Sequence, residues 1–248
     1  MSTVYILWLR QLKRTIRSRS RIIGSLGQPL LFLLALGFGF GPVFERAGGG
    51  NYIQFLAPGI MSMGILFTAI FSGIEIIWDR QFGFLKETLV APVPRLTIMI
   101  GRTLGGATVA SIQGAIIFAI TLIAGFRPTN WAMLPAAAVF VILIALLFTA
   151  VGTAIACLLE DFHGFQLIMN FLVMPLFFLS GALFPLENLP PLLNAIVRID
   201  PLSYGVDGLR GALTGLEQFS LWTDFTVLGL MTLLFLVVGS WLFSRIEA

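Results

Sequence analysis

Charged residues are scarce in this chain. Of its 248 residues, 11% are aspartate, glutamate, lysine or arginine, while 58% are hydrophobic and the mean hydropathy is +0.97. Soluble domains carry about 25% charged residues, so the composition excludes an ordinary soluble domain. Six stretches of at least 20 residues contain no charged side chain; they lie between positions 21 and 45, 46 and 75, 102 and 127, 127 and 160, 161 and 187, and 224 and 245.

These uncharged stretches are long enough to cross a bilayer, because a membrane-spanning helix needs about 20 mainly apolar residues. They are continuous apolar runs, whereas strands of a membrane barrel alternate polar and apolar residues over segments of about ten. We therefore predict an all-α polytopic membrane protein with six transmembrane helices, which forms a single domain over residues 1–248. The expected spans cover residues 22–40, 55–78, 98–124, 134–159, 165–184 and 225–243.

Side chains that support catalysis or metal binding are also few. The single cysteine, Cys157, lies in an apolar run where it is expected to pack, and the single histidine, His163, lies in a short turn. There is no H-E-x-x-H motif and no pair of aspartates at mid-membrane depth, so we predict no metal site, no bound cofactor and no intramembrane enzyme. The polar residues inside the spans are expected to form helix–helix contacts or to line a translocation path; they are Gln28, Gln113 and Asn170.

Lysine occurs only twice, as Lys13 and Lys86, and the sequence has no G-x-x-x-x-G-K-[ST] phosphate-binding loop. The chain is therefore not expected to hydrolyse ATP by itself. Ion-coupled carriers place ionisable groups inside their spans, but here Glu75 is the only acid in a predicted span, near its end, and no inverted repeat is apparent. An ion-coupled secondary transporter or channel without an ATPase partner is consequently the weaker transport hypothesis.

The cations are distributed unevenly between the two sides of the predicted membrane domain. With six spans both termini lie on one side, and that side holds all of the 15 lysine and arginine residues except Arg46, Arg127, Arg198 and Arg210. Since short loops rich in lysine and arginine remain in the cytoplasm, we predict cytoplasmic termini in a bacterial inner (plasma) membrane. The same asymmetry accounts for the pI of about 9.5, so a nucleic-acid partner is not implied.

Residues 1–21 are predicted to form an amphipathic cytoplasmic helix that lies in the membrane interface. Its cations suit contact with the headgroups of membrane lipids. The apolar face carries Tyr5, Trp8, Leu9, Leu12 and Ile16. The pattern fits equally a plain orientation signal and an interfacial helix that also contacts a cytoplasmic partner.

A short charged segment, WDRQFGFLKETLVAPVPR at residues 78–95, separates the second and third spans. Helical spacing places an apolar seam on one side of it, formed by Trp78, Phe82, Leu85 and Leu89. The rest of its surface carries Asp79, Arg80, Lys86 and Glu87. Because a residue that precedes proline is disfavoured in a helix, Pro92 and Pro94 should end the helix near residue 90.

Phe84 departs from this pattern, because it projects toward the polar side of the predicted helix. An aromatic ring exposed among charges suits docking to a protein partner. Periodicity alone favours an interfacial connector whose apolar seam rests on lipid. The alternative is a docking helix for a cytoplasmic partner.

The last outer connection, residues 185–224, is too apolar for a solvent loop and too often interrupted to cross the bilayer. PPLLNAIVRI should form a short helix that begins at Pro190 or Pro191. DPLSYGVDGLRGAL should form a second one, with Asp200 as its N-cap and Pro201 at its first position. Further polar positions along it are Tyr204, Asp207 and Arg210. Two short outer helices predict a re-entrant pair or a lid.

Four segments point to one family. They are WDRQFGFLKETLVAPVPRLTIMIGR, GQPLLFLLALGFGF, QFLAPGIMSMGILFTA and DPLSYGVDGLRGAL. The first resembles the signature of the type-2 ABC transporter permeases, in the branch with daunorubicin-resistance and nodulation-factor exporters. The other three resemble, in the right order, that family's first span, the start of its second span and the segment before its last span. The resemblance extends over nearly the whole chain.

The resemblance implies a permease that works with a second permease copy and two ATP-binding-cassette ATPase subunits, which use the ATP and Mg²⁺. In this family the segment between spans two and three is a coupling helix that docks into the ATPase. The matching region here is residues 79–95, and the residues expected to contact the ATPase are Asp79, Arg80, Phe82, Phe84, Lys86 and Glu87. Residues 190–213 match the outer re-entrant helices. Many relatives carry an acid where this chain has Gln81, so this chain lacks the charge for a salt bridge from that position.

Together these features predict the permease subunit of an ATP-driven ABC exporter, without enzymatic activity or a bound cofactor of its own. Spans without charge disfavour a highly charged soluble cargo. The expected cargo is therefore an amphipathic, lipid-like or hydrophobic drug-like molecule, moved out of the cytoplasm or the inner leaflet.

Overall fold

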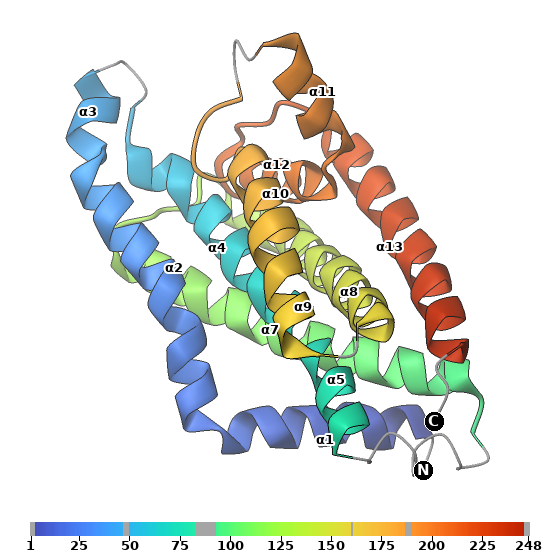
Figure 1. Cartoon of the computed structure of the whole chain (residues 1–248). Coiled ribbons are helices and arrows are strands. Elements are labelled where there is room, and N and C mark those ends of the chain that lie inside the picture. Colours follow the sequence, from blue (N-terminus) through green and yellow to red (C-terminus); the bar gives the residue numbers. More distant parts are fainter. Residues whose placement is uncertain (1–2, 47–49, 83–92, 160, 187–189, 246–248) are drawn as a thin grey trace.

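The chain folds into a bundle of helices. The computed structural model describes residues 3–46, 50–82, 93–159, 161–186 and 190–245, and within these ranges the regular elements are helices and there are no strands (Figure 1). Six helices in the described ranges are long and apolar enough to cross a membrane. The prediction of an all-α chain with six candidate spans is thereby confirmed.

The candidate spans begin and end close to the predicted positions. They are α2 (Arg19–Gly39); α4 (Tyr52–Phe71) with α5 (Ile74–Gln81); α7 (Arg95–Ile123); the short turn η1 (Trp131–Met133) with α8 (Leu134–Leu158); α9 (Phe162–Ile168), the π-helical turn η2 (Met169–Val173) and α10 (Met174–Leu179); and α13 (Leu221–Ser244). The fifth span ends at Leu179 rather than at residue 184, because the chain turns at Gly181, whose φ of 76° is left-handed and suits glycine.

The remaining helices cover the two ends of the bundle. α1 (Thr3–Arg17) lies across the end where α5 finishes, α7 begins and α13 finishes, which we call the terminal face (Figure 1). The opposite end, the distal face, carries α3 (Gly41–Arg46), α11 (Pro191–Ile199) and α12 (Pro201–Thr214). The two short helices predicted within residues 185–224 are therefore present.

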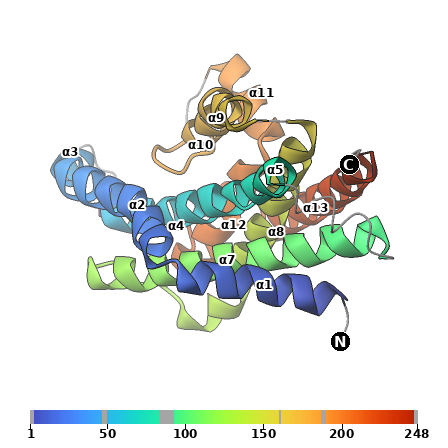
Figure 2. The same ribbon diagram turned by 60° about the horizontal axis from the view of Figure 1, so that its bottom comes forward.

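α1 is shorter than the helix predicted for residues 1–21. It ends at Arg17, and the chain turns at Ser18 into α2 (Figure 2). The abrupt change of direction lets α1 lie along α7 while α2 runs along the outside of the bundle (Figure 2). Residues 19–21 thus form the start of α2, and the candidate span within it begins at Ile22.

α1 packs on α7 through a face that includes Leu7, Trp8 and Gln11. Glycines on α7 set it: a Cβ on Gly101 would lie 2.9 Å from Leu7 Cβ, and a Cβ on Gly105 would lie 2.7 Å from Gln11 Cβ. Trp8 Nε1 adds a hydrogen bond to Thr108 Oγ1 at 3.0 Å. Tyr5 and Ile16 of the predicted apolar face lie outside this contact, since both side chains are exposed.

α4 forms the centre of the bundle. It contacts α2, α7, α8 and α12, and most of its residues are buried. Glycine permits its closest approaches, because a Cβ on Gly59 would overlap the carbonyl group of Ala182, and a Cβ on Gly73, between α4 and α5, would overlap that of Gly152 in α8. In return, a Cβ on Gly152 would lie 2.5 Å from the carbonyl oxygen of Ile70. Backbones in such contact hold the second and fourth spans at a fixed separation.

We expect Gly73→Ala to destabilise the fold by about 1–3 kcal/mol, because the added methyl group must displace the backbone of α8. Gly39→Ala is the matched control, since a Cβ at Gly39 meets nothing within 4 Å. Thermal unfolding in detergent should therefore show a lower Tm for Gly73→Ala only. Equal midpoints for the two variants would contradict the close contact between α8 and the α4–α5 junction.

Candidate functional site

The terminal face contains a cluster of buried charges around α5. Helical spacing puts Glu75 and Asp79 one turn apart on the same side of α5, and both are buried. Asp79 forms an ion pair with Arg102 of α7, and its Oδ1 lies 3.6 Å from Arg10 Nη2 of α1. Glu75 Oε2 lies 3.6 Å from Arg14 Nη1, also on α1. These ion pairs join α1, α5 and α7.

Arg80 fastens another side of α5. Its guanidinium donates to the carbonyl oxygens of Leu159 at 2.9 Å and Cys157 at 3.4 Å. These groups belong to the end of α8, where the last carbonyls of a helix lack intrahelical partners and carry partial negative charge. α5 is thus tied by charged side chains to three other helices, immediately before residues 83–92.

Three of the predicted ATPase-contact residues are described by the structure. Asp79 and Arg80 make the contacts within the chain given above, and Phe82 is 68% exposed, with its ring 6.2 Å from that of Trp78. The other three lie outside the described residues; they are Phe84, Lys86 and Glu87. Of the described members, two therefore make contacts within the chain and one is exposed.

The predicted helix was expected to run unbroken from Trp78 to near residue 90. That prediction is wrong at Phe82, because α5 ends at Gln81 with Phe82 as its C-cap. The next residue in the sequence is glycine, the type most often found directly after a helix end. The rest of the expected helix lies outside the described residues.

The sequence alone did not reveal one cluster of cations that pairs with the acids of α5. Its members are Arg10, Arg14 and Arg102. Arg102 could have been found from its position, because a cation two turns inside an apolar span requires a partner. Which acid pairs with Arg102 could not be predicted from the sequence, because Asp79 and Arg102 meet only when α5 packs beside α7.

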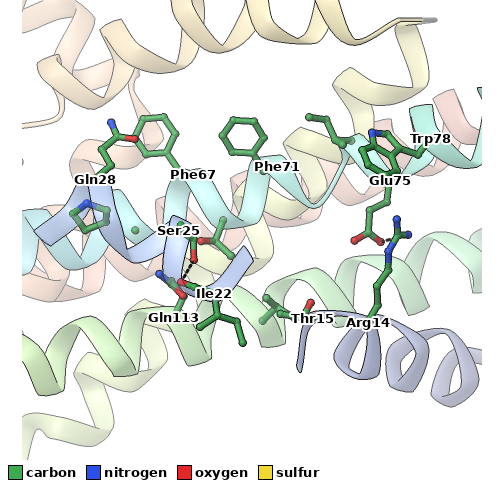
Figure 3. Close-up of a pocket in the computed structure, with 16 residues that line it drawn as sticks. Arg14, Thr15, Ile22, Ser25, Gln28, Phe67, Phe71, Glu75, Trp78 and Gln113 are labelled. Atoms are coloured by element: carbon green, nitrogen blue, oxygen red, sulfur yellow. Dashed lines mark hydrogen bonds and ion pairs between the residues drawn. The ribbon is translucent and has the colours of Figure 1, made fainter. Parts of the chain in front are cut away.

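The polar residues of the spans occupy two separate places. Gln28 and Gln113 line the same pocket, which has Arg14, Glu75 and Trp78 at its other end (Figure 3). Asn170 lies elsewhere, on η2, where it is exposed and accepts a hydrogen bond from Gln166 Nε2 at 3.4 Å. The structure thus brings together two of the three predicted residues.

The predicted cap at the distal face is confirmed. Asp200 is the N-cap of α12, since its Oδ1 accepts from the backbone N–H of Leu202 at 2.9 Å, and Pro201 follows at the first helical position. Burial raises the pKa of Asp200 to about 7. Tyr204 ties the two outer helices together, because its hydroxyl donates to the carbonyl oxygen of Arg198 at 2.8 Å.

Asp207 and Arg210 fix α12 to its surroundings. The carboxylate of Asp207 accepts from the backbone N–H of Phe219 at 2.7 Å and of Gln218 at 2.9 Å, and burial raises its pKa. Arg210 donates to the carbonyl oxygen of Gly181 at 2.8 Å, and its guanidinium lies 4.0 Å from the centroid of the Phe55 ring. Burial lowers the pKa of Arg210 to about 10, which leaves it charged at neutral pH.

A helical bundle with six candidate spans and no phosphate-binding loop in its sequence has the features of a membrane transport subunit. Comparison with known proteins identifies the family. Residues 2–214 match the ABC-2 type transporter family, and the chain therefore belongs to it.

Named relatives extend over most of the chain. The chain is 30% identical over 213 residues to Nodulation protein J of Rhizobium leguminosarum bv. trifolii. The aligned region covers 85% of this chain and 78% of that protein. It is 26% identical over 235 residues to the inner membrane transport permease YadH of Escherichia coli strain K12. That aligned region covers 94% of this chain and 91% of that protein.

The chain is accordingly a membrane permease of the ABC-2 type, a family without ATPase motifs, and it implies a separate ATPase subunit. The family resemblance predicted from sequence is confirmed. Within the described ranges, no group of three or more histidine, cysteine, aspartate or glutamate side chains could hold a metal ion.

Replacing Asp79 with asparagine should destabilise the protein by about 3–5 kcal/mol, because Arg102 is then a buried charge without its counter-ion. Combining Asp79→Asn with Arg102→Gln should recover part of the loss. Glu45→Gln on the exposed α3 is the control and should leave thermal unfolding unchanged. If Asp79→Asn unfolds at the same temperature as Glu45→Gln, the ion pair does not hold the terminal face together.

The raised pKa of Asp200 predicts a pH dependence. In the unfolded chain an aspartate titrates near pH 3.9, whereas folded Asp200 keeps its proton to about pH 7. The unfolded state therefore loses its proton first, and the contribution to stability falls as pH rises from about 4 to about 7. Asp200→Asn keeps a good N-cap and removes this titration, so the Tm difference between wild type and variant should change over that range. Parallel Tm curves would contradict the prediction.

Proposed function

We propose that this permease is the membrane subunit of an ATP-driven exporter whose cargo is an amphipathic, lipid-like or hydrophobic drug-like molecule, moved out of the cytoplasm or inner leaflet. The ABC-2 family match supports transport driven by a separate ATPase. The nearly uncharged spans support an apolar or amphipathic cargo, because a highly charged soluble one would cross them without counter-charges.

In this proposal the terminal face is cytoplasmic and the membrane is the bacterial inner membrane. Most of the lysine and arginine residues lie on the side of the termini, as expected for cytoplasmic segments. The name of the YadH relative includes the inner membrane, which agrees with this location.

Two ATPase subunits would dock on the terminal face of a permease dimer, with residues 79–95 as the coupling segment. The observation that carries this proposal is the attachment of α5 on several sides. Ion pairs of Asp79 and Glu75 bind it to α1 and α7, and Arg80 binds it to α8. A displacement applied next to Phe82 would therefore move several helices together instead of bending one loop.

The fifth span supports a second permease copy as partner. Gln166 and Asn170 form a polar pair on its exposed side, next to Phe171, which is 79% exposed. Polar side chains of spans face protein or water in preference to lipid. A second copy that packs on α9 and η2 would cover this pair, and a homodimer is the arrangement we propose.

At the distal face we propose that α11 and α12 form a re-entrant pair that closes the outer end of the path. α12 is almost entirely buried, although it is too short to cross the bilayer. Asp207 and Arg210 bind it to neighbouring segments, which keeps irregular backbone covered by protein.

The coupling role is tested with Phe84→Ala and Glu87→Ala in permease reconstituted with its ATPase subunit. Each variant should lose an interface contact worth at least about 1.4 kcal/mol, and transport-coupled ATP hydrolysis should therefore fall at least about tenfold. The Tm of the permease alone should stay unchanged. Phe40→Ala, an exposed phenylalanine at the distal end of α2, serves as the control. Wild-type coupled hydrolysis in both test variants would refute the assignment of residues 79–95.

A further inference from the structure

A pocket lies inside the elbow between α1 and α2, near the terminal face (Figure 3). Its volume is about 440 Å³, within the range of about 300–1,000 Å³ that small-molecule sites occupy. Its wall is built from α1, α2, α4, α5 and α7. The pocket shares the Arg14–Glu75 ion pair with the attachment of α5, but none of its lining residues lies within residues 79–95 or on the fifth span.

α2 contacts α4 from the distal end as far as Pro29, and the pocket opens between Pro29 and the terminal face. Toward the distal end a Cβ on Gly37 would lie 3.5 Å from Ile53 Cγ1, whereas a Cβ on Gly24 would meet nothing within 4 Å. Gly24 lines the pocket and is itself exposed. Its neighbour Ile23 is 71% exposed, as expected for a side chain that faces lipid. A molecule in the surrounding leaflet can therefore enter beside Gly24.

The middle of the pocket is apolar and partly aromatic. Phe67 and Phe71 of α4 line one wall, and Ile22 of α2 contributes to the opposite one (Figure 3). Side chains of this kind hold an apolar body by burying its surface.

The deep end of the pocket offers an unused hydrogen-bond donor. Gln113 is only 5% exposed, and its Nε2 is buried without a hydrogen-bond partner. Gln28 of α2 lies at the same end (Figure 3). Buried donors in proteins nearly always have a partner, and one left without is unfavourable. An acceptor oxygen on a ligand would satisfy Gln113.

The end next to the terminal face offers a cation. The guanidinium of Arg14 lies 5.8 Å from the centroid of the Trp78 ring, and its Nη1 is 3.6 Å from Glu75 Oε2. The side chain of Arg14 is 36% exposed and that of Glu75 only 8%. The accessible charge at this end is therefore positive, and it suits an anionic group.

We propose that this pocket binds an elongated anionic amphiphile that enters from the adjoining leaflet. Its acidic group contacts Arg14, its apolar body lies along Phe67 and Phe71, and an acceptor oxygen at its far end takes the hydrogen bond of Gln113. The two ends are about 20 Å apart, estimated from the helical rise between Gly64 and Trp78, which both line the pocket.

The proposal deepens the proposed function by naming the substrate class and its first contact, and in that respect it rests on the proposed function. Binding is measured on the purified permease without ATP or an ATPase. A failure of binding is therefore distinguishable from a failure of coupling at residues 79–95.

The probe is dansyl-aminoundecanoate, a fluorescent fatty acid with a carboxylate at one end and sulfonyl oxygens at the other. Its titration into purified permease in detergent should give a saturable rise in dansyl fluorescence. Gly24→Leu, which fills the pocket, should raise the Kd at least about tenfold. Gly27→Leu is the matched control, because a Cβ there also meets open space but Gly27 does not line the pocket; its Kd should stay within about twofold.

Two further variants test the ends of the pocket and do not depend on the folding of Gly24→Leu. Gln113→Leu should raise the Kd about 2- to 10-fold, as expected for one lost hydrogen bond. Arg14→Gln should weaken binding of the carboxylate probe several-fold and leave its neutral methyl ester unaffected. Absence of saturable binding to the wild type, or equal Kd values for Gly24→Leu and Gly27→Leu, would overturn the proposal. Equal losses of affinity for the carboxylate probe and for its methyl ester in Arg14→Gln would also overturn the proposal.

Discussion

The ion pair between Asp79 and Arg102, with Arg10 beside it, is the contact on which the terminal face depends. In a chain with so few charges, a carboxylate at 5% exposure is tolerated only because cations from two other helices neutralise it. The pairing fixes α1 against α5 and α7, although α1 itself crosses no membrane. Together with the bonds from Arg80 to α8, it makes the region before residues 83–92 a rigid attachment.

Rigidity continues into the bundle through glycine contacts. At Gly73 and Gly152 the backbones of the second and fourth spans touch, and at Gly59 the second span touches the turn after the fifth. α2, the fifth span and α13 are different, because few of their residues are buried. The bundle therefore combines a tightly packed centre with three outer spans that can contact lipid or a second copy. The pocket at Gly24 lies on one of these outer spans.

The sequence was a good guide to features that depend on local chemistry. Runs of at least 20 uncharged residues located the six spans, and Asp200 with Pro201 located the start of α12, because capping involves only neighbouring residues. It was a poor guide to contacts between helices. The buried face of α1 is set by Gly101 and Gly105 on another helix, so the amphipathic pattern of α1 did not reveal it. For the same reason the meeting of Gln28 with Gln113 was not predictable.

The central claim is that an ATPase acts on this permease through the terminal face beside α5. Its most direct measurement is cysteine cross-linking, which is selective here because the only native cysteine, Cys157, is buried. Phe82→Cys places a thiol at an exposed position of the terminal face, and Glu45→Cys places one at the distal face. With the ATPase subunit co-expressed, the account predicts cross-links to that subunit from position 82, with a yield that changes when ATP is added. It predicts none from position 45. Cross-linking from position 45 but not from position 82 would contradict it.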